Sequence, residues 1–147
     1  MKTLVINRTK DTVRYQFQSE QLKRLGMDFE RITATEVDTL TDRQKEDYQD
    51  NWQRPLRQTE IACTLSHHQC WQKIADTGET HFIIEDDAYM SNHTKAILDQ
   101  LSDDKEFDII SLETRDRDKF ISKSQFTLQS CIDHQLSCSC HLKPTNE

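Results

Sequence analysis

The chain has 147 residues, 31% of them charged, and a net charge of -7. This length is typical of a single domain and is enough to bury a real core. Proteins bind nucleic acid largely by neutralising its phosphates with Lys and Arg, and a chain with this negative net charge is therefore not expected to bind nucleic acid.

The first elements along the chain follow a strand–helix–strand pattern. Residues 3–6 are a short, largely β-branched run that predicts a buried strand. A helix is expected over residues 12–25, with Asp11 as its N-cap and Gly26 just after its end. A second strand is expected over residues 29–33, and this unit predicts a parallel sheet with a right-handed crossover. The apolar residues at helical spacing in the first helix are Val13, Phe17, Leu22 and Leu25.

The middle of the chain contains the clearest helix. Residues 37–58 are polar, and we expect mostly a solvated connector, with a short helix from about Thr41 as the alternative. A long helix is predicted over residues 59–77, capped by Thr59 and ended by Gly78. Its apolar stripe consists of Ile61, Leu65, Trp71, Ile74 and Ala75.

Two further strands are predicted after this helix. Residues 82–85 read as a buried strand, and residues 107–112 as a fourth. Between them, a short helix over residues 93–101 is expected, capped by Ser91 or Asn92. The alternation of strands and helices predicts an α/β domain with at least four strands.

Three acids, Glu85, Asp86 and Asp87, follow the third predicted strand directly. Open parallel sheets bind ligands at the carboxyl ends of their strands. Adjacent carboxylates there suit a hard divalent cation, which can also hold a diphosphate. That would replace the glycine-rich phosphate loop, which this sequence lacks. The alternative is a solvated acidic turn that caps the following helix.

Three separated segments resemble family 25 glycosyltransferases, of the bacterial lipooligosaccharide galactosyltransferase type. They are LVINRTKDTVRYQFQSEQLKRLGMDFERITATEVD, EIACTLSHHQCWQKI and FIIEDDA. Their order and spacing agree with the family over about residues 3–113. The resemblance implies a GT-A-like, Rossmann-like fold with a mixed sheet that binds a nucleotide sugar.

The resemblance also implies roles for the acids. Glu85 to Asp87 would hold Mn²⁺ or Mg²⁺ against the diphosphate of the donor. Asp87 is the expected direct ligand, and Glu85 or Asp86 would contact the ribose or a metal-bound water, with Glu85 also a candidate ligand. The sequence departs from the family where Thr39 and Ala62 replace glycines.

Five more residues match family positions at the expected site. Asn7 and Arg8 would lie beside the nucleotide, and Asp38 matches the acid of the Val-Asp-Gly element. Ser66 and His67 match a Ser-His pair that would face the donor sugar or brace the acidic loop. The alternative for His67 is a helix histidine satisfied by a buried hydrogen bond.

Other residues are assigned to packing or to the surface. We expect His68 at the surface and Trp71 in the core. The five cysteines are interpreted as free thiols and not as a disulfide framework. Three of them lie in the tail, where a zinc site is the alternative, although the spacing fits no standard finger.

The recognisable motifs end near Glu113. We therefore expect residues 1–113 to form the donor half of a GT-A-like domain and residues 114–147 an atypical tail, as a truncated gene would leave. The expected function is metal-dependent galactosyl transfer from a UDP-sugar to a lipooligosaccharide acceptor, impaired by truncation. The alternative is a non-catalytic nucleotide-binding or interaction module. We assign no catalytic base.

The remaining expectations concern location and assembly. No apolar run approaches the roughly 20 residues of a membrane span, and the N-terminal apolar run is too short for a signal peptide. This predicts a cytoplasmic protein, with peripheral association at the inner face of the membrane as the alternative. A sheet edge left uncovered after the fourth strand would favour a homo-oligomer.

Overall fold

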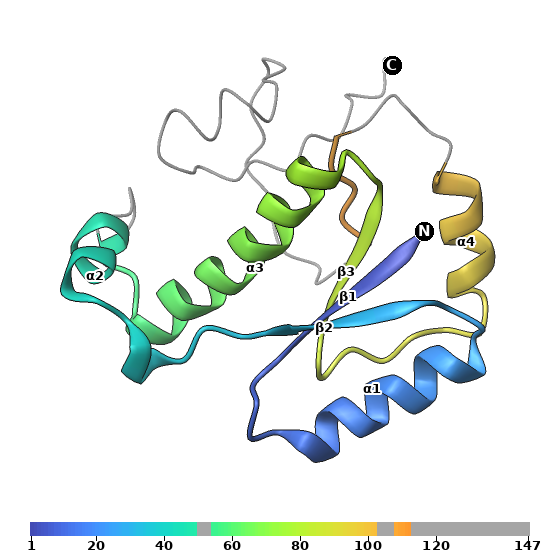
Figure 1. Cartoon of the computed structure of the whole chain (residues 1–147), viewed down its shortest axis with the longest axis horizontal. Coiled ribbons are helices and arrows are strands. Elements are labelled where there is room, and N and C mark those ends of the chain that lie inside the picture. The colour runs from blue at the N-terminus through green and yellow to red at the C-terminus, as the bar shows by residue number, and fades with distance from the viewer. Residues whose placement is uncertain (50–53, 103–107, 113–147) are drawn as a thin grey trace. The chain divides into compact units, whose positions relative to one another are not determined.

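The computed structural model describes residues 1–49, 54–102 and 108–112. Met1–Ser102 form one compact unit, and the short segment 108–112 belongs to a second unit, Asp103–Glu147. The site and its supporting elements all lie in the first unit, whose helices and strands are labelled in Figure 1.

A parallel sheet forms the centre of this unit. The part of the chain that the structure describes contains three strands, β1 (Lys2–Asn7), β2 (Phe29–Thr33) and β3 (His81–Glu85), in the order β2-β1-β3. The three strands predicted in this region are confirmed. In the register, Asn7 pairs with Thr33 and Ile6 with Glu85, so the carboxyl ends of all three strands lie at one edge.

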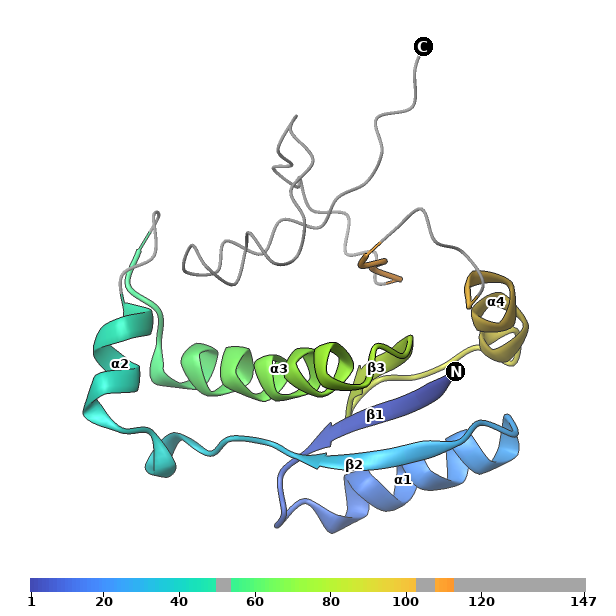
Figure 2. The same ribbon diagram turned by 45° about the horizontal axis from the view of Figure 1, so that its top comes forward.

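The helices cover both faces of the sheet. They are α1 (Thr12–Arg24), α2 (Asp42–Gln49), α3 (Gln58–Thr77) and α4 (Thr94–Leu101). Figure 2 shows α1 and α3 on opposite sides of the sheet. The alternation along β1 explains this arrangement, because Val5 packs with Leu22 of α1 whereas Leu4 packs with Cys70 of α3. The result is a three-layer α/β unit.

A third cluster folds the connector between β2 and α3. Buried Leu40 and Ile61 pack together, and Val37, Tyr48 and Leu56 pack against them. A short 3₁₀ turn, η1 (Val37–Thr39), and α2 are held in this way against the first turns of α3. The short helix that was the alternative for this segment is therefore present.

The buried face of α1 differs from the predicted one. Val13 is 80% exposed and Phe17 44% exposed, whereas Gln18 and Gln21 are buried beside Leu22. The physical reason lies outside the helix: both glutamines donate to the carbonyl of Ala88 in the loop after β3. Apolar spacing identified the helix correctly, but these two hydrogen-bonding side chains lie on its buried face.

The C-terminal ends of α1 and α3 agree with the glycine signals, whereas the predicted N-caps are confirmed only in part: Asp11 is the N-cap of α1, but His93 and not Ser91 or Asn92 is the N-cap of α4. Gly26 and Gly78 have φ of 64° and 66°, the left-handed conformation that glycine adopts without strain. Helix α3 starts at Gln58 after Arg57, so Thr59 is inside the helix and not its cap. Asp11 is at the N-cap of α1, but its carboxylate binds Arg8 in place of the helix backbone.

The predicted fourth strand is not formed over residues 108–112, which contain no strand. The isoleucines and leucine of this run, Ile109, Ile110 and Leu112, are exposed. A β-branched run becomes a strand only where a neighbour satisfies its backbone N–H and C=O groups. Phe107 and residues 113–147, including the tail cysteines, lie outside the described residues, so the expected division at residue 113 stays a prediction.

Candidate functional site

A groove of about 620 Å³ lies at the carboxyl ends of β1 and β3, beside the first half of α3. This is the edge where open parallel sheets bind ligands. Six of the predicted site residues line it: Asn7, Arg8, Asp38, Ser66, Glu85 and Asp86. His67 and Asp87 are outside this lining, but each is next to it. His67 contacts Glu85, and Asp87 follows Asp86 directly.

Asn7 is the centre of a hydrogen-bond network at the end of β1. It is 1% exposed, and its Nδ2 donates to Asp86 Oδ2 at 2.7 Å and to the Asp11 carbonyl at 3.0 Å. Its Oδ1 accepts a hydrogen bond from Arg31. Because both amide hydrogens and the amide oxygen are in use, Asn7 fixes the loop after β1 and Asp86 together.

Arg31 extends this network from the middle of β2. Its guanidinium also donates to the carbonyls of Arg8 and Thr9, at 3.0 and 3.3 Å. The same group lies 4.6 Å from the centre of the Tyr15 ring, a cation–π contact. Arg31 was not predicted from the sequence, although a charged residue between Phe29 and Ile32 in a predicted strand was a signal.

The turn after β3 is held on the side of α1. Asp86 Oδ1 lies 3.2 Å from Arg14, and the Asp86 side chain is only 13% exposed. Two residues further, Gln18 donates to the Ala88 carbonyl at 2.6 Å, and Gln21 accepts from the Met90 N–H at 2.8 Å. The acidic turn is therefore built into the domain and is not merely a solvated loop.

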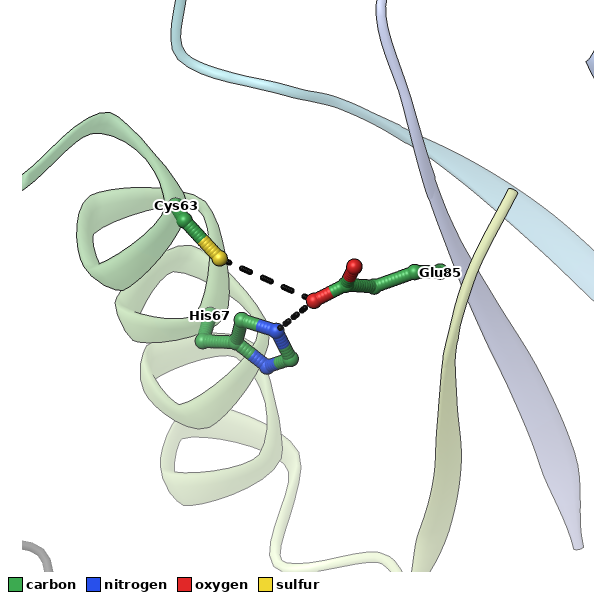
Figure 3. A group of neighbouring side chains, drawn as sticks. All are labelled: Cys63, His67 and Glu85. Carbon is green, nitrogen blue, oxygen red and sulfur yellow. Dashed lines mark hydrogen bonds and ion pairs between the residues drawn. The ribbon is translucent and has the colours of Figure 1, made fainter. Parts of the chain in front are cut away.

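Glu85 faces the other way, toward α3. Figure 3 shows Cys63 and His67 projecting from α3 toward its carboxylate. Cys63 Sγ lies 3.6 Å and His67 Nε2 3.0 Å from Glu85 Oε1. Hydrogen bonding to the Cys63 thiol and to the Glu85 carboxylate raises the pKa of His67 to about 9, against the opposing effect of burial. A protonated His67 thus forms an ion pair with Glu85 at neutral pH.

Ser66 joins α3 to the segment after β2. It is 2% exposed, its hydroxyl donates to the Ala62 carbonyl at 2.8 Å, and its oxygen accepts the Thr35 N–H at 2.9 Å. These contacts join Ser66 to the segment after β2, and its expected role at the donor sugar or the acidic loop stays a prediction. Ala62, at a position where the resemblance implies a glycine, is buried against Leu40 and Ile61 and lines the groove.

Charges of both signs surround the groove. Three basic residues, Arg8, Lys10 and Lys45, line it. Arg8 pairs with Asp11 at 2.6 Å, and Lys10 with Glu36 at 2.6 Å. Asp38 is exposed at its rim in η1. Lys45 pairs with Asp42 at 3.1 Å, so each of the three basic side chains of the groove has an acidic partner in the domain.

Helix α3 also differs in detail from its predicted stripe. Ala62, Ser66 and Cys70, spaced by four, are buried along it, whereas Ala75 is exposed and Trp71 is half-buried. The Trp71 ring lies 6.1 Å from that of His67, so it borders the histidine. Cys63 was missed in the sequence analysis. Its position four residues before His67, which puts both on one helix face, was the available signal.

The described part of the chain is a parallel α/β unit with a groove, lined by acidic and basic side chains, at its strand ends. The family model for glycosyltransferase family 25 (LPS biosynthesis protein) matches residues 1–146. The chain belongs to this family, as the sequence motifs predicted. The match continues past Glu113, where the recognisable motifs ended.

A related protein is procollagen galactosyltransferase 1 of Danio rerio. It is 34% identical over 64 residues, which are 42% of this chain and 11% of the relative. The chain thus matches about a tenth of the length of this relative. Within the described residues, no helix is both long enough and apolar enough to cross a membrane.

Proposed function

We propose that this chain binds the donor of a hexosyl transfer, with a UDP-sugar in the groove and galactose as the first candidate hexose. The observation that carries the proposal is the groove itself. The ends of β1 and β3, three basic side chains and two acids of the turn line it. The chain also belongs to glycosyltransferase family 25. Its volume of about 620 Å³ falls within the range of small-molecule sites.

A GT-A-like organisation is part of this proposal. The three-stranded parallel sheet is compatible with the N-terminal portion of such a domain. In it, the loop after β1 and the turn after β3 lie at the same edge, joined by the hydrogen bond from Asn7 to Asp86. A nucleotide diphosphate at that edge would lie between Arg8 and Lys10 on one side and the acids on the other.

Mn²⁺ or Mg²⁺ is the proposed metal, with Asp87 and Glu85 as its protein ligands. The donor set fits a hard cation, because both are carboxylates and both are exposed at the turn. Asp86 is less suited, since Asn7 and Arg14 already contact both of its oxygens. When bound, the ion would act as a Lewis acid that neutralises the departing diphosphate. The residues of this chain orient the turn and attract the phosphates.

The sugar and acceptor are proposed from the relatives. The family description refers to LPS biosynthesis, and the name of the Danio rerio protein specifies galactosyl transfer to procollagen. Galactose is therefore the sugar to test first, and a lipooligosaccharide or related oligosaccharide is the proposed acceptor. A homo-oligomer stays a prediction, for which light scattering is the measurement.

The test is calorimetric titration of the full chain with UDP, with and without Mn²⁺. We expect tighter binding with the ion, and we expect Asp87→Asn to remove that gain. The matched control is Asp99→Asn, the same change at an exposed acid of α4 that pairs with Lys95. This variant should keep the gain. Equal UDP affinity with and without Mn²⁺ in the wild type would reject the site.

A second measurement separates an enzyme from a binding module. The chain is incubated with UDP-galactose, Mn²⁺ and an oligosaccharide acceptor, and transferred galactose is quantified. Transfer that Asp87→Asn abolishes would support catalysis. Mn²⁺-dependent UDP binding without transfer would favour the non-catalytic nucleotide-binding module.

A further inference from the structure

Three metal-ligating side chains of different chemistry meet on the wall of the groove. Cys63 and His67 are four residues apart on α3, which puts them on the same helix face. Glu85 reaches them from the end of β3. The thiol sulfur, an imidazole nitrogen and a carboxylate oxygen all lie within 4.8 Å of one another. Figure 3 shows the three side chains converging.

We infer that Cys63, His67 and Glu85 bind a transition-metal ion of the Zn²⁺ or Co²⁺ class. This site is distinct from the Mn²⁺ or Mg²⁺ ion proposed at Asp87, although Glu85 is a candidate ligand of both. The inference rests on the geometry of the three side chains and not on the proposed donor binding.

The spacing of the donor atoms fits tetrahedral coordination. Zinc bonds of about 2.3 Å to sulfur and about 2.0–2.2 Å to nitrogen and oxygen put neighbouring ligand atoms roughly 3.2–3.7 Å apart. Sulfur and oxygen are 3.6 Å apart here, nitrogen and oxygen are 3.0 Å apart, and sulfur and nitrogen lie within 4.8 Å of each other. Small side-chain rotations would therefore bring all three atoms onto one ion.

The ligand types select the kind of metal. Thiolate and imidazole favour Zn²⁺ and Co²⁺, whereas sites for Mg²⁺ and Mn²⁺ are built from oxygen ligands. The thiolate and the carboxylate together neutralise the two positive charges of the ion. Binding displaces the thiol proton and the imidazolium proton, which pass to solvent.

Three protein ligands leave one position of a tetrahedral ion open, as in catalytic rather than structural zinc sites. Cys63 and Glu85 both line the groove. An ion held by them is therefore adjacent to the space in which we place the donor, where an anionic ligand can complete its coordination.

The test is a titration of the full chain with Co²⁺ alone, followed by absorbance. A Co²⁺–thiolate bond gives a near-ultraviolet charge-transfer band, and tetrahedral Co²⁺ gives intense visible bands. Because Cys131, Cys138 and Cys140 are additional cysteines, the titration is also performed with all three replaced by serine. We expect one equivalent of Co²⁺ to bind in this background with a charge-transfer band.

Matched substitutions assign the ligands. Cys63→Ala should abolish the charge-transfer band, whereas Cys70→Ala, at the buried thiol of the same helix, should keep it. His67→Asn should weaken Co²⁺ binding about tenfold or more, and His68→Asn should not. Circular dichroism checks that each variant is folded.

Two results would overturn the inference. One is a charge-transfer band that survives Cys63→Ala in the triple-serine background. The other is the absence of any band in that background while Cys63 is intact, which would assign binding to the tail thiols or to none. Asp87→Asn should leave the Co²⁺ band in place while removing the Mn²⁺-dependent gain in UDP affinity. The two proposals can therefore fail separately.

Discussion

Glu85 and Asp86 are neighbours in the chain, yet opposite sides of the domain hold them by different chemistry. Asp86 turns toward α1, where the amide of Asn7 and the guanidinium of Arg14 contact it. Glu85 turns toward α3, where a thiol and an imidazole contact it. The amide of Asn7 does not titrate. His67, on the side of Glu85, changes its charge near pH 9. The contacts of Asp86 with Asn7 and Arg14 therefore form the rigid side of the turn, and the contacts of Glu85 with Cys63 and His67 form its titratable side.

The largest loss of stability is expected from Asn7→Ala, because Asn7 joins Asp86 and Arg31 on the rigid side of the turn. The change deletes a buried amide and leaves Arg31 and Asp86 without its hydrogen bonds. We expect the free energy of unfolding to fall by about 3 kcal/mol, because each buried polar group left unpaired costs about 1–3 kcal/mol. Urea unfolding followed by circular dichroism measures it.

Arg8→Ala is the control for this change. Arg8 is the exposed neighbour of Asn7 and pairs with Asp11 at the surface. Since exposed ion pairs contribute about 0–1 kcal/mol, this variant should unfold nearly as the wild type does. Equal losses for the two variants would show that Asn7 does not organise the turn.

A smaller loss is expected from Gln21→Met, on the same rigid side. Methionine keeps the length of the side chain but removes the acceptor of the Met90 N–H and a donor to Ala88. We expect a loss of about 2 kcal/mol in the free energy of unfolding. Gln16→Met, at an exposed position of the same helix, should change stability by less than about 0.5 kcal/mol. If both variants unfold alike, the glutamine contacts do not hold the loop.

The titratable side of the turn, where His67 contacts Glu85, predicts that the free energy of unfolding depends on pH. The pKa of His67 is raised from 6.5 to about 9 in the folded protein, so the folded state binds more protons than the unfolded state between these values. Its contribution to stability is therefore complete below about pH 6.5 and is lost as pH rises through about 9. We expect this contribution to be on the order of 1 kcal/mol, because solvent screens a partly exposed pair.

The measurement compares unfolding free energies of the wild type and His67→Gln from pH 6 to pH 10, the range that brackets the titration. Glutamine retains an N–H donor near Glu85 but does not titrate, so its curve should lose this fall with rising pH. His68→Gln should retain the fall. A wild-type curve parallel to that of His67→Gln would mean that the pKa of His67 is not raised.

The sequence predicted the elements better than their faces. Strands β1, β2 and β3 and helices α1 and α3 follow from apolar runs and glycine stops, which are local signals. The buried face of α1 does not follow from local signals. Gln18 and Gln21 are buried because they form hydrogen bonds with a loop about 70 residues further along the chain. No local pattern in α1 encodes that contact.

The position of the candidate site was also predictable from the sequence, but its side-chain contacts were not. The acids after β3, and Asn7 at the end of β1, could be placed at one edge because parallel strands align their carboxyl ends. The pairing of Glu85 with α3 and of Asp86 with α1 could not, since it depends on which way each side chain turns. The spacing of Cys63 and His67 gave their common helix face, but not the partner that this face meets.

The smallest effect is expected from Arg14→Ala, which sharpens the comparison within the rigid side. Arg14 is the charged partner of Asp86, but its side chain is 57% exposed and its contact is 3.2 Å long. An ion pair so open to solvent contributes about 0–1 kcal/mol. Asp86 also keeps the shorter hydrogen bond from buried Asn7. The loss should therefore be under about 1 kcal/mol, and it should shrink further in about 1 M salt, where the Debye length falls to about 3 Å.

Arg43→Ala, which removes a more exposed pair on α2, provides the baseline. A loss as large as that of Asn7→Ala would mean that charge, and not the buried amide, fixes Asp86, and the distinction between the two acids would then rest on Arg14.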